Sequence, residues 1–447
     1  MNFSRDKFLV VGIQKSGVSA AELLLSKKAK CYVYDDNESP AVLAETKKLQ
    51  DLGAVAVGKD EVFSLLREID VLVLSPGVPL DHDIPLAAKK LGKRITGELE
   101  LASKFVTAPI VAVTGTNGKT TTCSMIDAIL KGNGMNSVLC GNVGTPLSAV
   151  LNKITDDSVV VAEVSSFQLE TVSSFTPHIS VITNITPDHL ARHYNMENYV
   201  YIKKRILTNL KESEYAVLCY DDETVRKAGE NIPAKTVYFS AKTEVNGAYC
   251  SEGKIFYKGK YVMDARSLSA KGEHNLLNAL ASVCVAEILG VSEKRIAETL
   301  SDFKGVKHRI QFVGNYGGAD YYNDSKATNT DATVKAIESM SKPTVLILGG
   351  KDKGLEFDSL FAEIKKSAVK SVVLTGESRY RMLDAAKRAG FENVSLTEDF
   401  YVAIELAQYL ADEGDAVLFS PACSSFDRFT DFEQRGEEFI RTVESMK

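Results

Sequence analysis

The stretch from Val111 to Thr122 combines the residue types that bind a phosphate chain. An apolar run leads into Gly115 and Gly118, which allow tight turns whose amides, with the start of a following helix, form an anion site. Lys119 can reach terminal phosphates and the Thr120 hydroxyl can ligate Mg²⁺. A full phosphate loop has glycine where Val113 stands, so this loop is a shorter variant. A glycine-rich connector with a solvated lysine is the alternative, but the coincidence of strand, spacing and helix favours a nucleoside triphosphate site.

Three further polar groups lie where they could do chemistry. Glu163 follows the apolar run 158–162, and a carboxylate at the end of a buried strand lies at the crevice where α/β proteins bind ligands. A surface glutamate is a poor fit after so apolar a run. His189 follows Asp188, but a lone histidine is more often structural or exposed than a ligand. Asn275 and Asn278 are three residues apart, so they share one helix face.

A second glycine turn, from Gly12 to Gly17, resembles a dinucleotide-binding fingerprint. Gln14 occupies the second glycine position of that pattern and would limit the close approach of a pyrophosphate. Asp35 follows at the distance of a ribose-binding acid, although an acidic turn after a strand is common. An NAD-dependent oxidoreductase is therefore an alternative that any functional assignment must exclude.

Composition limits the class of protein. The chain has 447 residues, a formal net charge of −6 and 45% apolar residues. This mild acidity provides no global field for nucleic acid or an anionic membrane. The seven cysteines are odd in number and form no C-x-x-C pair, which indicates reduced thiols. The apolar run 8–13 is too short for a signal peptide or a membrane span, so we expect a soluble cytoplasmic protein. We also expect a monomer.

Alternating apolar runs and amphipathic stretches predict α/β domains with mostly parallel sheets. The length predicts about three domains, which we place at 1–107, 108–308 and 309–447. Glycine turns between 237 and 263 predict antiparallel hairpins, and a long helix is expected over 274–289. Other expected elements are strands at 7–13, 30–34, 70–74, 110–113, 344–348, 371–374 and 416–419, and helices at 18–28 and near 97–105.

The ordered set of motifs resembles the Mur ligase family along essentially the whole chain. Each motif alone is weak, but their order is specific. The resemblance implies a Rossmann-like N-terminal domain that binds a UDP substrate, a central P-loop ATPase-like domain and a Rossmann-like C-terminal domain. The motifs are 75–78, 114–121, 141–144, 163–170, 184–190, 272–278, 308–309, 323–329 and 420–427.

Within this family, the stretches 167–170 and 420–423 most resemble the members that add D-glutamate. The implied reaction joins D-glutamate to UDP-N-acetylmuramoyl-L-alanine, through an acyl phosphate, in peptidoglycan precursor synthesis, with ATP and Mg²⁺. Another Mur-type ligase, or a folylpolyglutamate synthase, with a different amine substrate is the alternative within the enzyme class. A non-catalytic nucleotide switch is a further alternative.

The resemblance also implies a carbamylated lysine. The family carries it in a Lys-x-Arg-Ile setting, which selects Lys203 over Lys204, in a stretch that we expect to begin a helix. Carbamylation requires a neutral amine and hence a lowered pKa. The implied catalytic residues are Lys119, Glu163, His189 and Lys203, and the implied metal ligands are Thr120, Glu163, His189 and the carbamate of Lys203.

The resemblance assigns the substrates as follows. ATP would contact Gly115, Thr116, Asn117, Gly118, Lys119, Thr120, Thr121, Asn278, Arg309, Asp324 and Lys326, with the C-terminal domain closing over it. The UDP substrate would contact Ser16, Asp35, Ser75 and Asn142. D-glutamate would contact Thr328, Lys353, Ser425, Phe426 and Phe432, with Lys351 as the alternative to Lys353.

Overall fold

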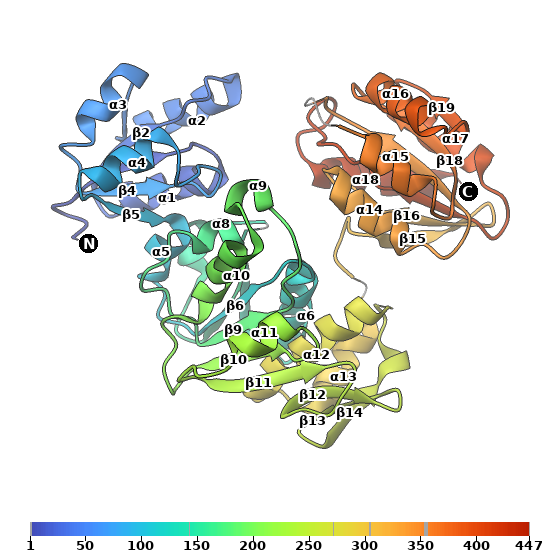
Figure 1. The fold of residues 1–447 in the computed structure, drawn as a ribbon, viewed down its shortest axis with the longest axis horizontal. Helices are drawn as coiled ribbons and strands as arrows, with labels where there is room; N and C mark the ends of the chain where they lie inside the picture. Colours follow the sequence, from blue (N-terminus) through green and yellow to red (C-terminus); the bar gives the residue numbers. More distant parts are fainter. Residues whose placement is uncertain (1, 143, 271, 304, 353–355, 447) are drawn as a thin grey trace. The chain divides into compact units, whose positions relative to one another are not determined.

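Short, fully buried apolar runs form the strands that organise this chain. The computed structural model describes residues 2–142, 144–270, 272–303, 305–352 and 356–446. The chain divides into two compact units, Met1–Phe303 and Lys304–Lys447. The first unit contains two sheets and the second contains one (Figure 1).

The N-terminal sheet is parallel, with strand order β3-β2-β1-β4-β5. The three central strands, β1, β2 and β4, carry consecutive apolar residues that are buried on both faces, whereas the edge strands β3 and β5 are more exposed. The strands are β1 (Lys7–Val11), β2 (Lys30–Tyr34), β3 (Val55–Ala56), β4 (Val71–Leu74) and β5 (Arg94–Gly97). The helices are α1 (Lys15–Ser26), α2 (Pro40–Asp51), α3 (Lys59–Leu65), α4 (Asp83–Lys90) and α5 (Glu98–Ser103).

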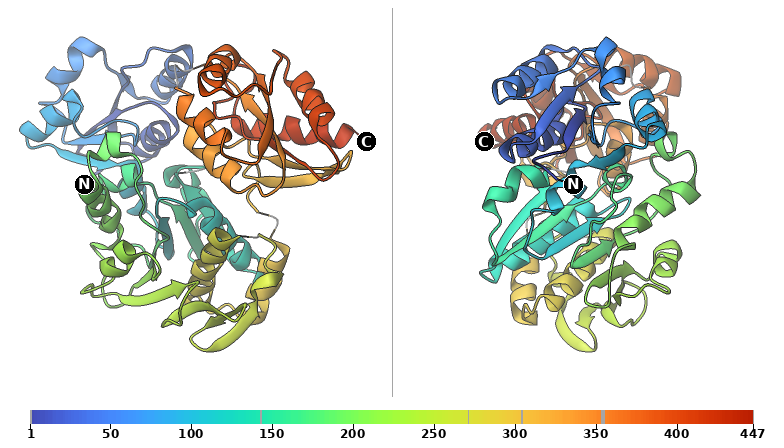
Figure 2. Two further views of the ribbon diagram at one scale, coloured as in Figure 1. Left: turned by 45° about the vertical axis from the view of Figure 1, so that its right-hand side comes forward. Right: turned by 90° about the vertical axis from the view of Figure 1, so that its left-hand side faces the viewer.

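The central sheet has the order β14-β13-β12-β11-β10-β9-β6-β8-β7 and is parallel except at its β14 end (Figures 1 and 2). Its strands are β6 (Ile110–Thr114), β7 (Asn136–Gly141), β8 (Ser158–Glu163), β9 (Ile179–Ile182), β10 (Tyr215–Cys219), β11 (Lys235–Ser240), β12 (Gly247–Ser251), β13 (Lys254–Tyr257) and β14 (Lys260–Asp264). The α-helices are α6 (Lys119–Gly132), α7 (Leu147–Val150), α8 (Ser166–Leu169), α9 (Leu190–His193), α10 (Met196–Lys204), α11 (Glu223–Ala228), α12 (Glu273–Ile288) and α13 (Glu293–Asp302), and 3₁₀ turns span Leu151–Lys153, Arg205–Leu207 and Ala265–Ser267.

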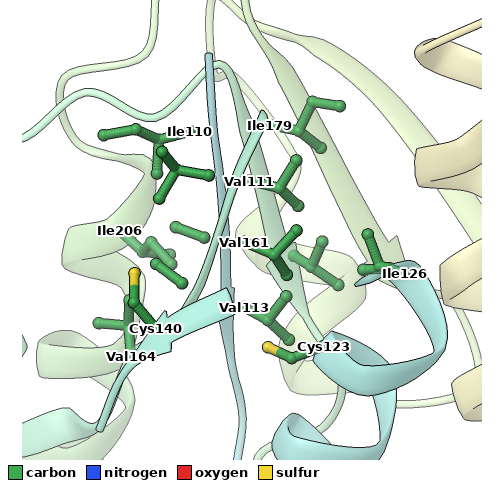
Figure 3. Close-up of a cluster of buried hydrophobic side chains, with 14 of the residues drawn as sticks. Ile110, Val111, Val113, Cys123, Ile126, Cys140, Val161, Val164, Ile179 and Ile206 are labelled. Carbon is green, nitrogen blue, oxygen red and sulfur yellow. The ribbon is translucent and has the colours of Figure 1, made fainter. Parts of the chain in front are cut away.

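The core of the central sheet is an aliphatic cluster (Figure 3). Val111, Val113 and Val161 of the middle strands pack with Cys123 and Ile126 of α6. These side chains are almost completely buried. The packing fixes the C-terminal end of β6 against the start of α6, which is where the phosphate loop lies.

Two sequence predictions for the central region are wrong. The turn at Asn246-Gly247 does not make a hairpin, because β12 pairs with β11 in parallel. The two later glycine turns, at Gly253 and Gly259, do join antiparallel strands. The stretch 201–206 ends a helix rather than beginning one, since α10 closes at Lys204.

The C-terminal unit places helices on both faces of one sheet, of order β15-β16-β20-β17-β18-β19. In β17 (Thr344–Gly349), Leu346 and Leu348 face the core of α14 (Thr330–Glu338), α15 (Asp358–Ile364) and α16 (Arg379–Ala389). Val345 and Ile347 face α17 (Phe400–Leu410) and α18 (Phe432–Ser445). The other strands are β15 (Gln311–Tyr316), β16 (Ala319–Asn323), β18 (Val369–Thr375), β19 (Val394–Leu396) and β20 (Ala416–Phe419), of which only β15 is antiparallel to its neighbour.

The cysteines are free thiols, and all are buried except Cys250, which is half-buried. Burial raises the pKa of several of them, for example that of Cys284 to about 12. No helix in the described part of the chain is long and apolar enough to cross a bilayer.

Candidate functional site

The phosphate loop joins β6 to α6 as the sequence predicted. Gly118 precedes α6 with φ +83°, a left-handed conformation that glycine adopts without steric cost. A Cβ at Gly118 would lie 2.2 Å from Asn278 Oδ1, and one at Gly115 would lie 1.9 Å from Thr183 Oγ1. The backbone of the phosphate loop therefore lies directly against the side chains of Thr183 and of Asn278 in α12.

Strand order gathers the other candidates beside this loop. Val113 of β6 is level with Glu163 of β8, and Gly141 of β7 is level with Glu163 on its other side. Asn142, just after β7, donates from Nδ2 to Glu163 Oε1 at 3.0 Å. Glu163 is buried. The carboxyl ends of β6, β7 and β8 thus place a buried carboxylate next to the phosphate loop, where parallel sheets bind ligands.

Lys119 and Lys203 converge on the same backbone carbonyl. The Nζ atoms of Lys119 and Lys203 donate to Gly115 O at 2.9 and 2.8 Å, and Lys119 also donates to Thr116 O at 2.9 Å. Lys203 is only 1% exposed, whereas Lys204 is exposed. The site therefore holds two amines at one end of the loop, and the sequence-adjacent lysine faces solvent.

Burial is the main reason that the Lys203 pKa lies well below its ordinary value, and the nearby Lys119 charge lowers it further. Its ammonium lies over the Tyr199 ring, 4.8 Å from the centroid. Among the described residues no carboxylate lies within ion-pair distance of Lys203. The lowered pKa favours the neutral amine, the form that carbamylation requires.

His189 lies in the loop that follows β9, the other neighbour of β6. Its backbone is left-handed, with φ +53°, and its ring lies 5.0 Å from that of Phe167. The side chain is half exposed and lies 3.4 Å from Asp188. His189 is thus available to a ligand, with Asp188 immediately beside it.

The four candidates for the UDP substrate fall into two places. Ser75 and Asp35 lie at the turn after β1, where Asp35 accepts a hydrogen bond from the Ile13 amide at 2.5 Å. A Cβ at Gly12 would lie 2.6 Å from Ser75 Cβ, so Ser75 is packed against this turn. Ser16 lies in the first turn of α1, half-buried. Asn142 lies instead beside Glu163. Gln14 is exposed in an extended conformation just before α1.

The C-terminal unit holds the remaining candidates in its own loops. Asp324 is buried, and its carboxylate accepts hydrogen bonds from Ser420 Oγ at 2.7 Å and from the Ile310 amide at 3.1 Å. Burial raises its pKa to about 7, against the lowering effect of these hydrogen bonds. The Lys326 ammonium lies 6.0 Å from the centre of the Phe432 ring.

The other candidates of this unit differ in exposure. Arg309 and Thr328 are half-buried, Ser425 is buried and Phe426 is 61% exposed. Lys353 falls outside the described residues, and Lys351 pairs with Glu377 at 2.9 Å.

Comparison with known proteins identifies the family. Residues 6–97, 113–286 and 308–423 match the Mur ligase MurD-like N-terminal domain, the Mur ligase middle domain and the Mur ligase glutamate ligase domain. A Pelotomaculum thermopropionicum protein named UDP-N-acetylmuramoylalanine–D-glutamate ligase is 43% identical, covering 100% of this chain and 99% of its own length. A Clostridioides difficile protein of the same name is 39% identical, with 100% of both chains covered. The chain belongs to the Mur ligase family.

Solved structures share the fold of this Mur ligase. MurF from Acinetobacter baumannii aligns with a TM-score of 0.60 at 18% identity, covering 97% of this chain and 93% of that one. UDP-N-acetylmuramate-alanine ligase MurC from Thermotoga maritima aligns with a TM-score of 0.58 at 21% identity, covering 99% and 100%. Family membership implies that this Mur ligase uses ATP, in agreement with the prediction from the loop.

Several residues that support the site were missed by sequence reasoning. Asn184 accepts from the Asn117 amide at 2.9 Å, and its carbonyl accepts from the Thr116 amide at 2.9 Å. Thr183 Oγ1 donates to Asn117 O at 2.6 Å, and Thr116 Oγ1 lies 3.1 Å from Tyr199 OH. The position of Asn184 directly after an apolar strand was the available signal.

A second missed network joins the two sheets of the first unit. Arg192 of α9 donates to both carboxylate oxygens of Glu170, at 3.0 and 2.6 Å. The same guanidinium donates to the carbonyls of Pro76 and Val78, at 3.4 and 3.0 Å. Arg192 thereby connects the helix that follows His189 to the loop after β4, which carries Ser75.

Proposed function

We propose that this Mur ligase joins D-glutamate to UDP-N-acetylmuramoyl-L-alanine, with ATP converted to ADP and phosphate. The substrate carboxylate takes the terminal phosphoryl group of ATP, which gives an acyl phosphate, and the amine of D-glutamate then displaces phosphate to form the amide. The observation that carries the proposal is the pair of lysine amines, Lys119 and Lys203, at the carbonyl of Gly115. The full-length likeness to proteins named for this reaction supports the choice of substrates.

The site's charges suit the first step. A carboxylate must approach a triphosphate of the same sign, so fixed cations have to offset the repulsion. Lys119 now donates to carbonyls of its own loop, and it would exchange these partners for phosphate oxygens. Asn278, Asn117 and the amides at the start of α6 would hold the phosphate chain in line.

We also propose that the site takes Mg²⁺ and that Lys203 carries a carbamate. In the described ranges no group of three or more His, Cys, Asp and Glu side chains gathers, so a metal here would depend on a different donor set. Thr120, Glu163, His189 and a carbamate on Lys203 supply mainly oxygen atoms, which Mg²⁺ prefers. Bound there, the metal would neutralise phosphate charge. The buried Glu163, with one amide donor, and the buried Lys203 amine fit this role.

For the substrates, we propose that Ser16, Asp35 and Ser75 bind the UDP end and that Asn142 lies nearer the sugar or diphosphate. In the C-terminal unit, we propose Arg309, Asp324 and Lys326 for ATP, and Thr328, Lys353, Ser425, Phe426 and Phe432 for D-glutamate. We propose that the enzyme works as a cytoplasmic monomer with domains at 1–107, 108–308 and 309–447.

The decisive experiment mixes the enzyme with ATP, Mg²⁺, UDP-N-acetylmuramoyl-L-alanine and a panel of amino acids, and measures products by mass. We expect the D-glutamyl product only with D-glutamate. Product with another amine would indicate a sister ligase, and ATP binding without product would indicate a nucleotide switch. In a separate assay with added NAD(P)H, a change in its absorbance would indicate an oxidoreductase.

Lys204 provides a matched control for the carbamate. We expect Lys203→Ala to lose most activity and to regain part of it with added short-chain carboxylates, because these replace the missing carboxylate-like group. Lys204→Ala should retain activity, since its side chain is exposed. Full activity of Lys203→Ala would refute the carbamate while leaving the ligase proposal intact.

A further inference from the structure

A cavity of about 170 Å³ lies in the C-terminal unit, apart from the residues proposed above for substrates. It opens at the carboxyl ends of β17 and β18, between Gly349-Gly350 and Thr375-Gly376, and extends to Asp427–Phe429 and Arg435. None of the described residues proposed for D-glutamate lines it. The cavity is therefore not part of that proposed pocket.

The topology of the sheet makes this position a ligand crevice. β17 lies between β20 and β18. The chain leaves β17 toward α15 on one face of the sheet and leaves β20 toward α18 on the opposite face. Adjacent parallel strands whose connections leave to opposite faces define the switch point at which open α/β sheets bind ligands. Here that point lies between β17 and β20, and the cavity reaches it at Phe419, the last residue of β20.

Glycines expose backbone at this crevice. A Cβ at Gly376 would lie 2.5 Å from Asp427 Oδ2 and 2.8 Å from the Gly350 amide nitrogen. A Cβ at Gly350 would lie 3.0 Å from Arg435 Nη1. Gly376, at φ +70°, and Gly350, at φ +154°, both adopt backbone conformations that other residues rarely adopt. The packing brings backbone amide, guanidinium and carboxyl groups close together without intervening side chains.

Arg435 is the unusual member of the cavity wall. It is 2% exposed, and it donates from Nε to Ser325 Oγ at 3.0 Å and from Nη2 to Ser325 O at 2.8 Å. Its Nη1 is buried without a hydrogen-bond partner in the described structure. Burial lowers its pKa to about 10, so the group is charged at neutral pH. A buried cationic donor without a partner is costly, because it has lost its hydration and gained no hydrogen bond in return.

Other charged groups of the cavity are already paired. Arg379 pairs with Glu398 at 3.1 Å, and Arg428 pairs with Asp399 at 2.8 Å. Asp427 is the acid that faces Arg435, but it makes no ion pair with it within 4 Å in the described structure. Burial raises the pKa of Asp427, whereas the charge of Arg435 lowers it.

We propose that this cavity binds a phosphoryl group, either free phosphate or the end of a small phosphate monoester, through Arg435 Nη1. The site goes beyond the proposed ligase reaction. A phosphoryl group supplies an anionic oxygen for the Arg435 guanidinium, whose Nη1 has no other partner in the described structure. The glycine backbone can approach such a group closely, as it does at other phosphate sites.

Substitutions of Arg435 and of Asp427 should change the affinity for a phosphoryl group in opposite directions. The full chain is titrated calorimetrically with inorganic phosphate and, separately, with glycerol 3-phosphate. We expect saturable binding of at least one of the two. Arg435→Gln should weaken binding at least about tenfold, the loss of one charge-assisted pair. Asp427→Asn should strengthen it, because the neutral amide removes the carboxylate charge that opposes an oxyanion at Arg435. Arg441→Gln is the matched control on α18, where Arg441 pairs with Glu438 at the surface.

Binding by phosphate alone would identify the free anion, and binding by glycerol 3-phosphate alone would identify the monoester. Hydrogen exchange should show ligand protection in residues 375–380. Absence of binding by both probes, protection elsewhere only, or weaker binding in Asp427→Asn would overturn the proposal. If Arg435→Gln fails to fold, the sign of the Asp427→Asn effect decides. These measurements omit ATP and both ligase substrates, so their failure is separable from failure of the ligase assay.

Discussion

Glu100 provides a quantitative test of how the first unit is held together. This α5 carboxylate is 1% exposed and accepts hydrogen bonds from the backbone amides of Ser173, Ser174 and Phe175, at distances from 2.9 to 3.2 Å. Lys104 donates to it at 3.0 Å. Glu100 therefore ties the end of the N-terminal region to the loop before β9.

The size of the effect follows from the pKa. Burial alone would raise the pKa of Glu100, but the hydrogen bonds from Ser174, Ser173 and Lys104 outweigh it and lower the pKa to about 2, from 4.5. At about 1.4 kcal/mol per pKa unit, the ionised carboxylate stabilises the folded state by roughly 3 kcal/mol. Because the folded-state pKa is depressed, this stability is present above pH 4.5 and is lost as the pH falls toward 2.

We expect Glu100→Gln to destabilise the first unit by roughly 3 kcal/mol at pH 7 and by only about 1 kcal/mol at pH 3, where the unfolded carboxyl is already protonated. Urea unfolding followed by circular dichroism measures both values, with the transitions of the two units fitted separately. Glu45→Gln is the control, since Glu45 makes only a surface pair with Lys48, worth less than about 1 kcal/mol. Equal effects of the two substitutions at pH 7 would refute the reasoning.

Three further predictions concern the site. Gly118→Ala should abolish ATP binding in a titration, because its Cβ would lie 2.2 Å from Asn278 Oδ1. Gly134 is also left-handed but has open space around it, so Gly134→Ala should bind ATP normally. Equal loss of ATP binding in both variants would contradict the contact argument. His193 should stay neutral down to about pH 4 in an NMR titration, because burial and the neighbouring Arg192 charge lower its pKa; protonation near pH 6.5 would contradict this. Arg192→Lys should raise KM for the UDP substrate about tenfold or more, while an unchanged KM would show that this bridge does not position the loop.

Local patterns predicted much of the fold because they act over short distances. The apolar runs gave the strands 30–34, 110–113 and 416–419, and glycine spacing gave the phosphate loop. The Asn246-Gly247 turn misled because turn chemistry does not determine which strand becomes the neighbour. β12 pairs in parallel with β11, a choice set by packing across the sheet.

The missed site residues share a different reason. Asn184, Arg192 and Arg435 gain their importance from partners that lie far away in sequence, such as Ser325 for Arg435, 110 residues distant. A buried arginine looks like a surface arginine when only its neighbours in the chain are read. Lys203 was separated from Lys204 only by resemblance, whereas burial separates the two side chains directly.

The sequestration of the native thiols makes this chain a convenient object for spectroscopy. Maleimides react with thiolates. Six native sulfurs are buried, and burial also raises the pKa of the half-buried Cys250, which would be replaced by serine as a precaution. Cysteines introduced at Tyr261 and Tyr409, which are 51% and 86% exposed in separate units, would take dyes selectively on that background. Energy transfer between such dyes would test, in single molecules, whether nucleotide and amino acid change the distance between the two dyes.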